Sequence, residues 1–226
     1  MRQLSFILVI AVMGTAILLW LGKWQLDRLT WKQGILTEIS EKIYADPITL
    51  PIRPTVQEHK FSAVSVTGAL GETYVRVLAS QKHIGAGYRI ISPLIIEDRR
   101  ILVDRGFIKT EAPMTAAEDR QISVLGNLHW PDEIDSYTPD PDIQGNIWFA
   151  RDIDALAAHL GTDPILIVAR EVTPADPAVT PLPVSTQGIP NDHFQYAMTW
   201  FSLAAVWSIM SLIFIWRMRR TNKGPL

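Results

Sequence analysis

The sequence predicts a membrane protein in which two transmembrane helices, one near each terminus, flank one mainly antiparallel β (α+β) extramembrane domain. The first observation is a pair of uncharged apolar runs at residues 4–21 and 194–216. At about 1.5 Å per residue, a helix of this length crosses a hydrocarbon core of about 30 Å. The second observation is the mostly polar region between the runs, where several strand-like segments precede a single late helix.

The first apolar run has an alternative interpretation as a cleaved signal peptide. Its apolar stretch is longer than a typical signal core, and the segment from Trp20 to Trp24 offers no small-x-small cleavage site. We therefore interpret residues 4–21 as an uncleaved first transmembrane helix and residues 194–216 as the second.

Lys and Arg residues in the short segments that flank a transmembrane helix favour the cytoplasmic side of the membrane. The tail at 217–226 holds a basic cluster and no acidic residue: Arg217, Arg219, Arg220 and Lys223. Lys23, Arg28 and Lys32 after the first span oppose this orientation more weakly. The sequence therefore predicts a multi-pass protein with both termini cytoplasmic. Its main domain would lie in the periplasm at a bacterial inner (plasma) membrane, or in the equivalent mitochondrial intermembrane space.

The extramembrane domain is expected to span residues 22–193. It begins with a helical stem at 22–44, which ends because Asp46-Pro47 interrupts the helical spacing. β-Branched segments bounded by glycine and proline then predict strands at 61–67, 73–78, 87–97, 100–108, 122–130 and 165–172. Asp98-Arg99 is the expected turn between the third and fourth of these. The succession of strands leaves a small barrel and a sandwich open.

Local signals define the remaining segments of the domain. Asp152 is expected to cap a short helix that stops at Gly161. Residues 130–145 contain three prolines among acidic residues and indicate a long surface loop. Residues 173–190 contain five prolines, so we expect an extended leash into the second span.

Composition and motif content exclude several function classes. The chain has no cysteine, which excludes disulfides, thiolate chemistry and cysteine-ligated metals. A net charge of −2 gives no sign of nucleic-acid binding. Known nucleophile, metalloprotease and nucleotide-binding motifs are absent from the sequence, so we expect no catalytic residues and no enzyme activity. Three acidic pairs are interpreted as solvated turns: Glu97-Asp98, Glu118-Asp119 and Asp132-Glu133.

The five histidines are far apart in the sequence and have no metal-ligand spacing: His59, His83, His129, His159 and His193. His193 differs because it stands immediately before the second apolar run. On a helix, His193, Tyr196, Trp200 and Trp207 would lie near one face, and Trp24 occupies a matching depth after the first span. One interpretation is an aromatic belt at the membrane surface.

The other interpretation is a haem pocket. A neutral imidazole can supply an axial nitrogen to iron, and aromatic side chains can cover the macrocycle. Arg28, Arg76 or Arg105 would then form charge-assisted hydrogen bonds with the propionates. The residues alone leave the belt and the pocket open.

Five sequence blocks occur in the order typical of one family. They are Leu21-Gly22-Lys23-Trp24-Gln25-Leu26-Asp27-Arg28 with Trp31-Lys32, Gly68-Ala69-Leu70 with Glu72-Thr73-Tyr74-Val75-Arg76, Gly87-Tyr88 with Ser92-Pro93, Leu102-Val103-Asp104-Arg105-Gly106-Phe107, and Asn191-Asp192-His193-Phe194-Gln195-Tyr196 with Thr199-Trp200. Over nearly the whole chain, these blocks resemble the Surfeit locus protein 1 family (Shy-type cytochrome c oxidase assembly factors), with the pattern of a bacterial member. Asp104 departs from the pattern, where Asn is common.

The resemblance implies a non-enzymatic assembly factor for aa3-type cytochrome c oxidase. It would bind or present haem a, received from haem a synthase, for insertion into cytochrome c oxidase subunit I. The alternative is a haem-free scaffold that binds subunit I or haem a synthase. The family's haem-iron ligand falls on His193, and five further residues match motif positions: Tyr196, Trp200, Trp24, Arg28 and Arg105. Trp24 and Arg28 could instead anchor the first helix, and Arg105-Gly106 could instead form a strand-end turn.

Overall fold

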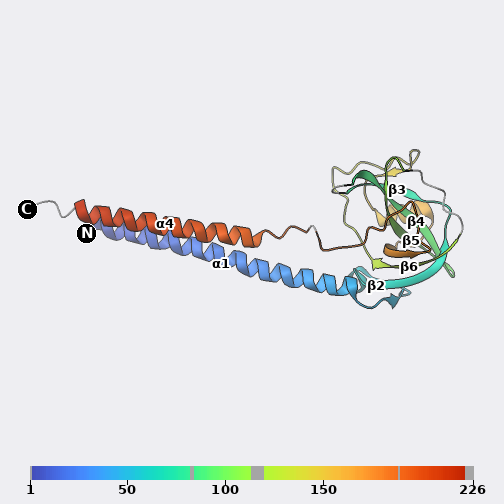
Figure 1. Ribbon diagram of the computed structural model, residues 1–226, viewed down its shortest axis with the longest axis horizontal. Helices are drawn as coiled ribbons and strands as arrows, with labels where there is room; N and C mark the ends of the chain where they lie inside the picture. Colours follow the sequence, from blue (N-terminus) through green and yellow to red (C-terminus); the bar gives the residue numbers. More distant parts are fainter. Residues whose placement is uncertain (1, 82–83, 113–119, 188, 222–226) are drawn as a thin grey trace, which may run out of the picture. The chain divides into compact units, whose positions relative to one another are not determined.

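The computed structural model describes residues 2–81, 84–112, 120–187 and 189–221 (Figure 1). The chain divides into two compact units, a helical unit of residues 1–38 with 187–226 and a sheet unit of residues 39–186. Each unit is described by itself. His83, the Glu118-Asp119 pair and Lys223, which the sequence analysis named, lie outside the described residues.

Two long apolar helices make up the helical unit. Helix α1 covers Arg2–Tyr44 and α4 covers His193–Thr221. By length and composition, both could cross a membrane. Helix α1 continues without interruption past the apolar run and ends at Tyr44, as the Asp46-Pro47 break predicted. Its last turns, from Ile39, belong to the sheet unit.

Within the helical unit, α1 and α4 lie side by side and antiparallel (Figure 1). The less exposed positions recur every three or four residues, at 11, 14, 18, 21, 25, 29 and 32 on α1 and at 197, 200, 204, 208, 211 and 215 on α4. This spacing is typical of helix pairs whose side chains interlock along a shallow left-handed crossing. We call this line of contact the helix seam.

Small residues and hydrogen bonds hold the helix seam together. A Cβ on Gly14 would lie 2.6 Å from Nε1 of Trp207, so only glycine leaves room for the indole. That Nε1 donates to the carbonyl of Ala11 at 3.1 Å. One turn along α1, the hydroxyls of Thr15 and Ser208 are 3.0 Å apart. Close backbone approach and interhelical hydrogen bonds are the interactions that associate helices in an apolar solvent.

The sheet unit contains the remaining elements. In the described part of the chain these are β1 (Ile48–Thr49), α2 (Val56–His59), β2 (Ala63–Leu70), β3 (Val75–Gln81), β4 (Gly85–Ile96), β5 (Arg99–Lys109), β6 (Arg120–Leu128), β7 (Ile147–Trp148), α3 (Ile153–Leu160) and β8 (Leu166–Thr173). The strands form one sheet in the order β1-β2-β6-β8-β5-β4-β3-β7, and β2 also pairs with β4. That extra pairing closes β2, β6, β8, β5 and β4 into a ring, which is the small barrel rather than the sandwich.

The prediction of a mainly antiparallel domain holds for five of the eight strand pairings among the described residues, and the sheet is mixed because the other three are parallel. The antiparallel pairs are β2–β4, β2–β6, β3–β4, β4–β5 and β6–β8, but β1–β2, β3–β7 and β5–β8 are parallel. Parallel neighbours require a crossover, and the segment containing α3 provides one before β8. The sequence analysis missed β1, β7 and α2 because each is only two to four residues long.

Strand β8 is central because it is buried on both faces. Its even-numbered residues, such as Leu166 and Val168, pack with Leu156 of α3, whereas Ile167 and Ala169 point into the barrel core. Two-sided burial explains why β8 begins as a continuous apolar run rather than an alternating one. Helix α3 therefore covers one outer face of the barrel.

Local predictions for α3 are confirmed. The Asp152 side chain accepts from the backbone N–H of Ala155 at 3.1 Å, and Gly161 ends the helix in the left-handed conformation at φ 63°. The predicted turn between β4 and β5, at Asp98-Arg99, is wrong by one residue. Ile96 pairs with Arg99, and the turn lies at Glu97-Asp98.

The strand expected at 61–67 continues through Gly68 to Leu70, so its predicted end is wrong, and the reason is physical. A Cβ on Gly68 would lie 2.3 Å from the carbonyl oxygen of Ile95. Gly68 therefore does not terminate the strand: it lets the β2 backbone approach β4 and close the ring.

Part of the predicted leash is packed on the domain. Val179 is buried, and Thr180 exchanges two backbone hydrogen bonds with Phe107 of β5, at 2.7 and 2.9 Å. Gly106 makes this approach possible at φ 128°, because a Cβ would lie 2.1 Å from the Thr180 carbonyl oxygen. The leash is therefore anchored near its middle, since its backbone groups find partners on β5 instead of water.

Candidate functional site

The residue that the sequence singled out lies on the helix seam. His193 is the first residue of α4 and is half-buried. Its Nδ1 is 2.8 Å from Oε1 of Gln25 on α1. Three residues earlier, the carbonyl of Pro190 accepts a hydrogen bond from the Lys32 ammonium. Both the side chain of His193 and the backbone leading to it are therefore tied to α1.

This contact indicates which ring nitrogen of His193 carries a proton. An amide oxygen can only accept, so the proton shared with Oε1 belongs to Nδ1 of His193. Among the residues that the structure describes, Nε2 has no hydrogen-bond partner, so it is the nitrogen that carries the free lone pair whenever the imidazole is neutral. A neutral imidazole with Nε2 available is the form that ligates a metal.

Four further motif residues flank this contact on exposed or half-exposed surface. Trp24 and Tyr196 are 46% and 57% exposed, and Trp200 is half-buried. Arg28 is exposed and stacks its guanidinium 4.4 Å above the ring of Trp31. Within the described ranges, no ion pair involves Arg28.

Helix geometry gathers these residues on one side of the seam. Trp24 and Arg28 are four residues apart on α1, and Tyr196 and Trp200 are four apart on α4, so each pair shares a helix face. Viewed down the axis of α1 from its N-terminus, Trp24 and Arg28 lie to one side of Gln25. Viewed the same way down α4, Tyr196 and Trp200 lie to that same side of His193. Because α1 and α4 are antiparallel, these positions place both pairs on the same side of the helix pair.

Arg105 and Arg76 lie in the sheet unit and have other partners. Arg105 is 3% exposed and pairs with Asp176, while burial lowers its pKa against the opposing charge of Asp176. Arg105 is the unpaired residue of a bulge inside β5, since Ile90 and Ile91 face Gly106 and Asp104. The alternative of a strand-end turn is therefore wrong.

Arg76 is similarly occupied within the sheet unit. It stacks on Tyr88 at 4.9 Å and donates to the carbonyls of Gly145 and Asn146. The hypothesis that Arg76 or Arg105 presents a free guanidinium to a ligand finds no support in these contacts.

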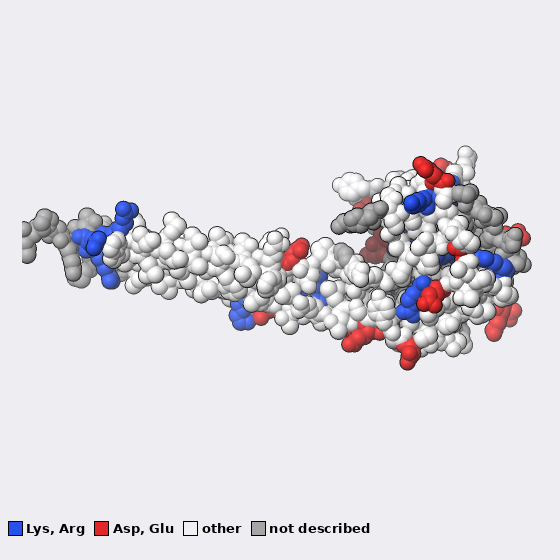
Figure 2. All heavy atoms as spheres, in the orientation of Figure 1, with Lys and Arg blue, Asp and Glu red and all other residues white. Residues whose placement is uncertain are grey.

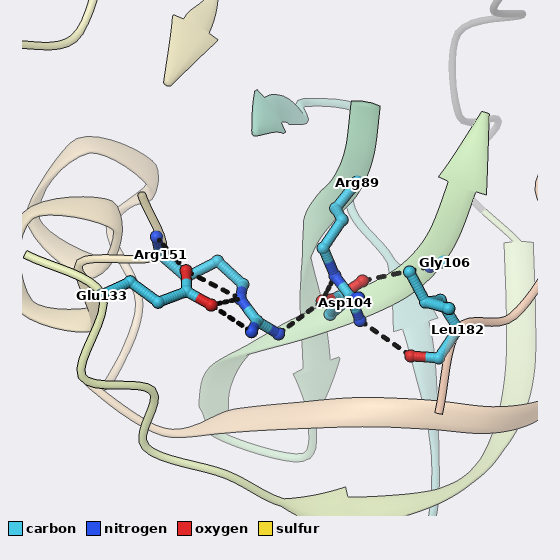
Figure 3. Close-up of polar contacts among 6 residues, drawn as sticks. All are labelled: Arg89, Asp104, Gly106, Glu133, Arg151 and Leu182. Carbon is cyan, nitrogen blue, oxygen red and sulfur yellow. Dashed lines mark hydrogen bonds and ion pairs between the residues drawn. The ribbon is translucent and has the colours of Figure 1, made fainter. Parts of the chain in front are cut away.

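A buried charge network, shown in Figure 3, lies at the wall of the barrel. The fully buried Asp104 carboxylate accepts from Arg89 at 2.5 Å, from Arg151 at 3.4 Å and from the backbone N–H of Gly106 at 3.2 Å. Arg89 also donates to the Leu182 carbonyl of the leash, at 2.8 Å. This network joins β4, β5, the leash and the segment before α3.

Glu133 completes the network and corrects one prediction. The Asp132-Glu133 pair was interpreted as a solvated turn, but Glu133 forms an ion pair with Arg151 and accepts from its backbone N–H at 3.0 Å. Burial opposes ionisation of Glu133, yet the hydrogen bonds and charge of Arg151 outweigh it and lower the pKa of the carboxyl. Burial likewise opposes the charge of Arg151, whose pKa is nevertheless raised by Glu133 and Asp104.

The contacts within this network indicate a structural role rather than a catalytic one. Each carboxylate is held by at least one guanidinium, and no nucleophile faces a base among these residues. In the described part of the chain, no group of three or more His, Asp or Glu side chains could hold a metal ion. The sequence analysis noted Asp104 only as a departure from a motif. An acidic residue inside an apolar strand was the signal that it is buried and paired.

Comparison with known proteins places these observations in a family. The SURF1 family model matches residues 12–205, which include Gln25, His193 and the sheet unit. The chain belongs to the SURF1 family. The sequence resemblance is thereby confirmed.

Relatives within the SURF1 family match most of the chain. The SURF1-like protein of Rickettsia felis is 31% identical over 95% of this chain and 96% of its own length. Surfeit locus protein 1 of Rattus norvegicus is 27% identical over 91% of this chain and 72% of its own. The human Surfeit locus protein 1 is 26% identical over 84% of this chain and 71% of its own length.

In this SURF1-family chain, Asp104→Ala is expected to lower the free energy of unfolding by about 3–5 kcal/mol, because two buried guanidinium groups lose their shared anion. Thermal and denaturant unfolding of the detergent-purified protein measures this. The matched control is Asp163→Asn, which breaks the exposed pair with Arg99 and should cost less than about 1 kcal/mol. Equal losses in the two variants would contradict the structural role of Asp104.

His129 is expected to make stability depend on pH. Burial, together with the charges of Arg151 and Lys60, lowers its pKa from 6.5 to about 4, and its ring stacks on Phe61. The unfolded chain therefore binds more protons between these values, so stability is fully present above pH 6.5 and falls towards pH 4. The loss is roughly 3 kcal/mol at most.

The measurement is the unfolding free energy between pH 4 and 7 for the wild type and His129→Leu. The substitution should flatten the dependence in this window. Parallel curves would show that His129 titrates alike in the folded and unfolded states.

Proposed function

We propose that this SURF1-family protein is a membrane-anchored assembly factor for aa3-type cytochrome c oxidase. It binds or presents haem a for insertion into subunit I. The proposed spans are residues 4–21 and 194–216 in a bacterial inner membrane. The periplasmic domain comprises residues 22–193, and the basic tail at 217–226 stays in the cytoplasm.

The observation that carries this proposal is the contact of His193 Nδ1 with Gln25, which leaves Nε2 without a hydrogen-bond partner among the described residues, at the start of the second apolar helix. The donor chemistry fits haem iron, because an imidazole nitrogen is a common axial ligand. The Gln25 contact also leaves Nε2, rather than Nδ1, as the available atom.

The order of residues along the helices supports the fit. Along the axis from the polar flank into the apolar run come Arg28, then Trp24 and His193 at one level, then Tyr196 and Trp200. At 1.5 Å per residue, this series extends over roughly 15 Å. Its charged end is in the polar flank and its aromatic end is in the apolar region. Haem has the same polarity, with charged propionates at one edge and an apolar macrocycle.

Each residue has a distinct proposed role. His193 binds the iron, Arg28 pairs with the propionates, and Trp24, Tyr196 and Trp200 cover the apolar faces. Bound haem a supplies the redox-active iron that subunit I requires. Arg105 matched a family motif, but its burial and its pairing with Asp176 favour a structural role instead.

The partners proposed are the membrane, haem a synthase as donor and cytochrome c oxidase subunit I as acceptor. A haem-free scaffold for the same partners is the second candidate. The exposure of Trp24 and Tyr196 favours it equally, since aromatic side chains at this depth also suit an interfacial belt or a contact with another membrane protein. Haem content distinguishes the two candidates.

The proposed topology is testable because the chain has no native cysteine. Asp140→Cys, on an exposed loop of the sheet unit, should react with a membrane-impermeant maleimide in intact spheroplasts. Thr221→Cys, beyond the second apolar run, should react only after the membrane is permeabilised. The reverse pattern would overturn the proposed orientation, and labelling of both in intact spheroplasts would overturn the two-span arrangement.

His193→Ala is expected to lower the haem a content several-fold without removing the protein from the membrane, because the iron loses its axial nitrogen. The measurement is the reduced optical spectrum of protein purified from cells that make haem a, normalised to protein concentration. His159→Ala, at an exposed position on α3, is the matched control and should keep the wild-type haem content. A colourless wild type with confirmed haem a supply would favour the scaffold.

A further inference from the structure

We infer that Gln25 is a positioning residue for His193: its amide oxygen holds the imidazole in the tautomer and orientation that present Nε2 to haem iron. This inference rests on the proposed function and deepens it. Gln25 is 168 positions away from His193 in the sequence, and the 2.8 Å contact between them exists only because α1 and α4 pack side by side.

The chemistry of the contact selects one tautomer. Free imidazole exchanges its proton between two nitrogens, and only an unprotonated nitrogen can bind a metal. With Oε1 of Gln25 as acceptor, the proton stays on Nδ1 of His193. Nε2, across the ring, is then the ligand atom and is turned away from the acceptor. Ligating histidines are generally oriented in this way by a partner at their other nitrogen.

The surroundings hold the acceptor in place. Gln25 lies on the helix seam, three residues from the buried Gly22, where a Cβ would lie 2.6 Å from the ring of Phe201. Two turns further along α1, Lys32 holds the carbonyl of Pro190. These contacts limit sliding or rotation of α1 against the start of α4, so the amide stays opposite the ring.

The neutrality of Gln25 is relevant to a carrier. A carboxylate acceptor would draw the Nδ1 proton more strongly and make Nε2 a stronger donor to iron, whereas an amide strengthens it less. A factor that must release its haem benefits from an oriented ligand that is not maximally basic. Gln25 therefore combines orientation with a moderate iron–nitrogen bond.

The first test needs no haem. In ¹⁵N-histidine-labelled protein in detergent, the His193 ring is identified as the signal lost in His193→Ala. Its nitrogen shifts should report a proton on Nδ1 in the wild type and a mixture of tautomers in Gln25→Leu. Gln33→Leu, at an exposed position on the same helix, is the control and should leave the wild-type pattern. An unchanged His193 tautomer in Gln25→Leu would overturn the inference.

The second test uses haem a itself, titrated into the purified full-length variants. Gln25→Leu should weaken haem a binding roughly 10- to 100-fold. Gln25→Glu should retain binding, raise the iron–histidine stretching frequency in resonance Raman spectra and lower the reduction potential. Gln33→Leu should match the wild type in all three readouts.

The outcomes separate the two levels of the proposal. If the wild type binds haem a through His193 and Gln25→Leu binds it with the same affinity and Raman frequency, the positioning role is overturned and the proposed function stands. If the wild type binds no haem a, the proposed function fails, and the tautomer measurement still reports whether the Gln25 contact exists. Equal membrane levels and melting temperatures of the variants show that loss of fold does not explain the result.

Discussion

The packing of α1 against α4 is the interaction on which the candidate site depends. Within the helical unit, only the narrow helix seam is buried along each helix, and most of the large apolar side chains are exposed. What joins the two helices is close approach at small residues such as Gly14, together with the Trp207–Ala11 and Thr15–Ser208 hydrogen bonds across the seam. Only this approach brings Gln25 and His193 within hydrogen-bonding distance.

The sheet unit solves a different physical problem. Its five-strand ring buries one core inside the barrel and a second core beneath α3, so β5 and β8 face apolar residues on both sides. Where charged groups enter the wall, they are matched, with Asp104 between Arg89 and Arg151, and Arg105 against Asp176. Buried charges are tolerated in this fold because each has a partner from another segment.

The arrangement also separates the roles of the arginines. Arg76, Arg89, Arg105 and Arg151 have partners within the sheet unit, which reduces their availability to a ligand. Arg28 is exposed on α1, where it stacks on Trp31 and has no ion pair among the described residues. Among the described residues, Arg28 is therefore more available to an anionic ligand than these four arginines are.

Local signals were sufficient for much of the fold and for part of the site. The two apolar helices, the stop after Tyr44 and the capped helix from Asp152 to Gly161 follow from residue types within one or two turns. His193 was identified by its place in the sequence before an apolar run. Gln25 was not, because nothing in its immediate neighbours indicates a partner 168 positions away.

The sequence by itself determined where the chain is apolar, roughly where the long helices and strands lie, and which family it belongs to, because these depend on short-range chemistry. Only the tertiary structure decided that β5 and β8 are parallel, that Gly68 lets the ring close, and that Arg105 is buried against Asp176. It also decided that Nδ1 of His193 faces an acceptor on α1. Those properties depend on contacts between distant segments, and the positions of such contacts are set by packing and burial.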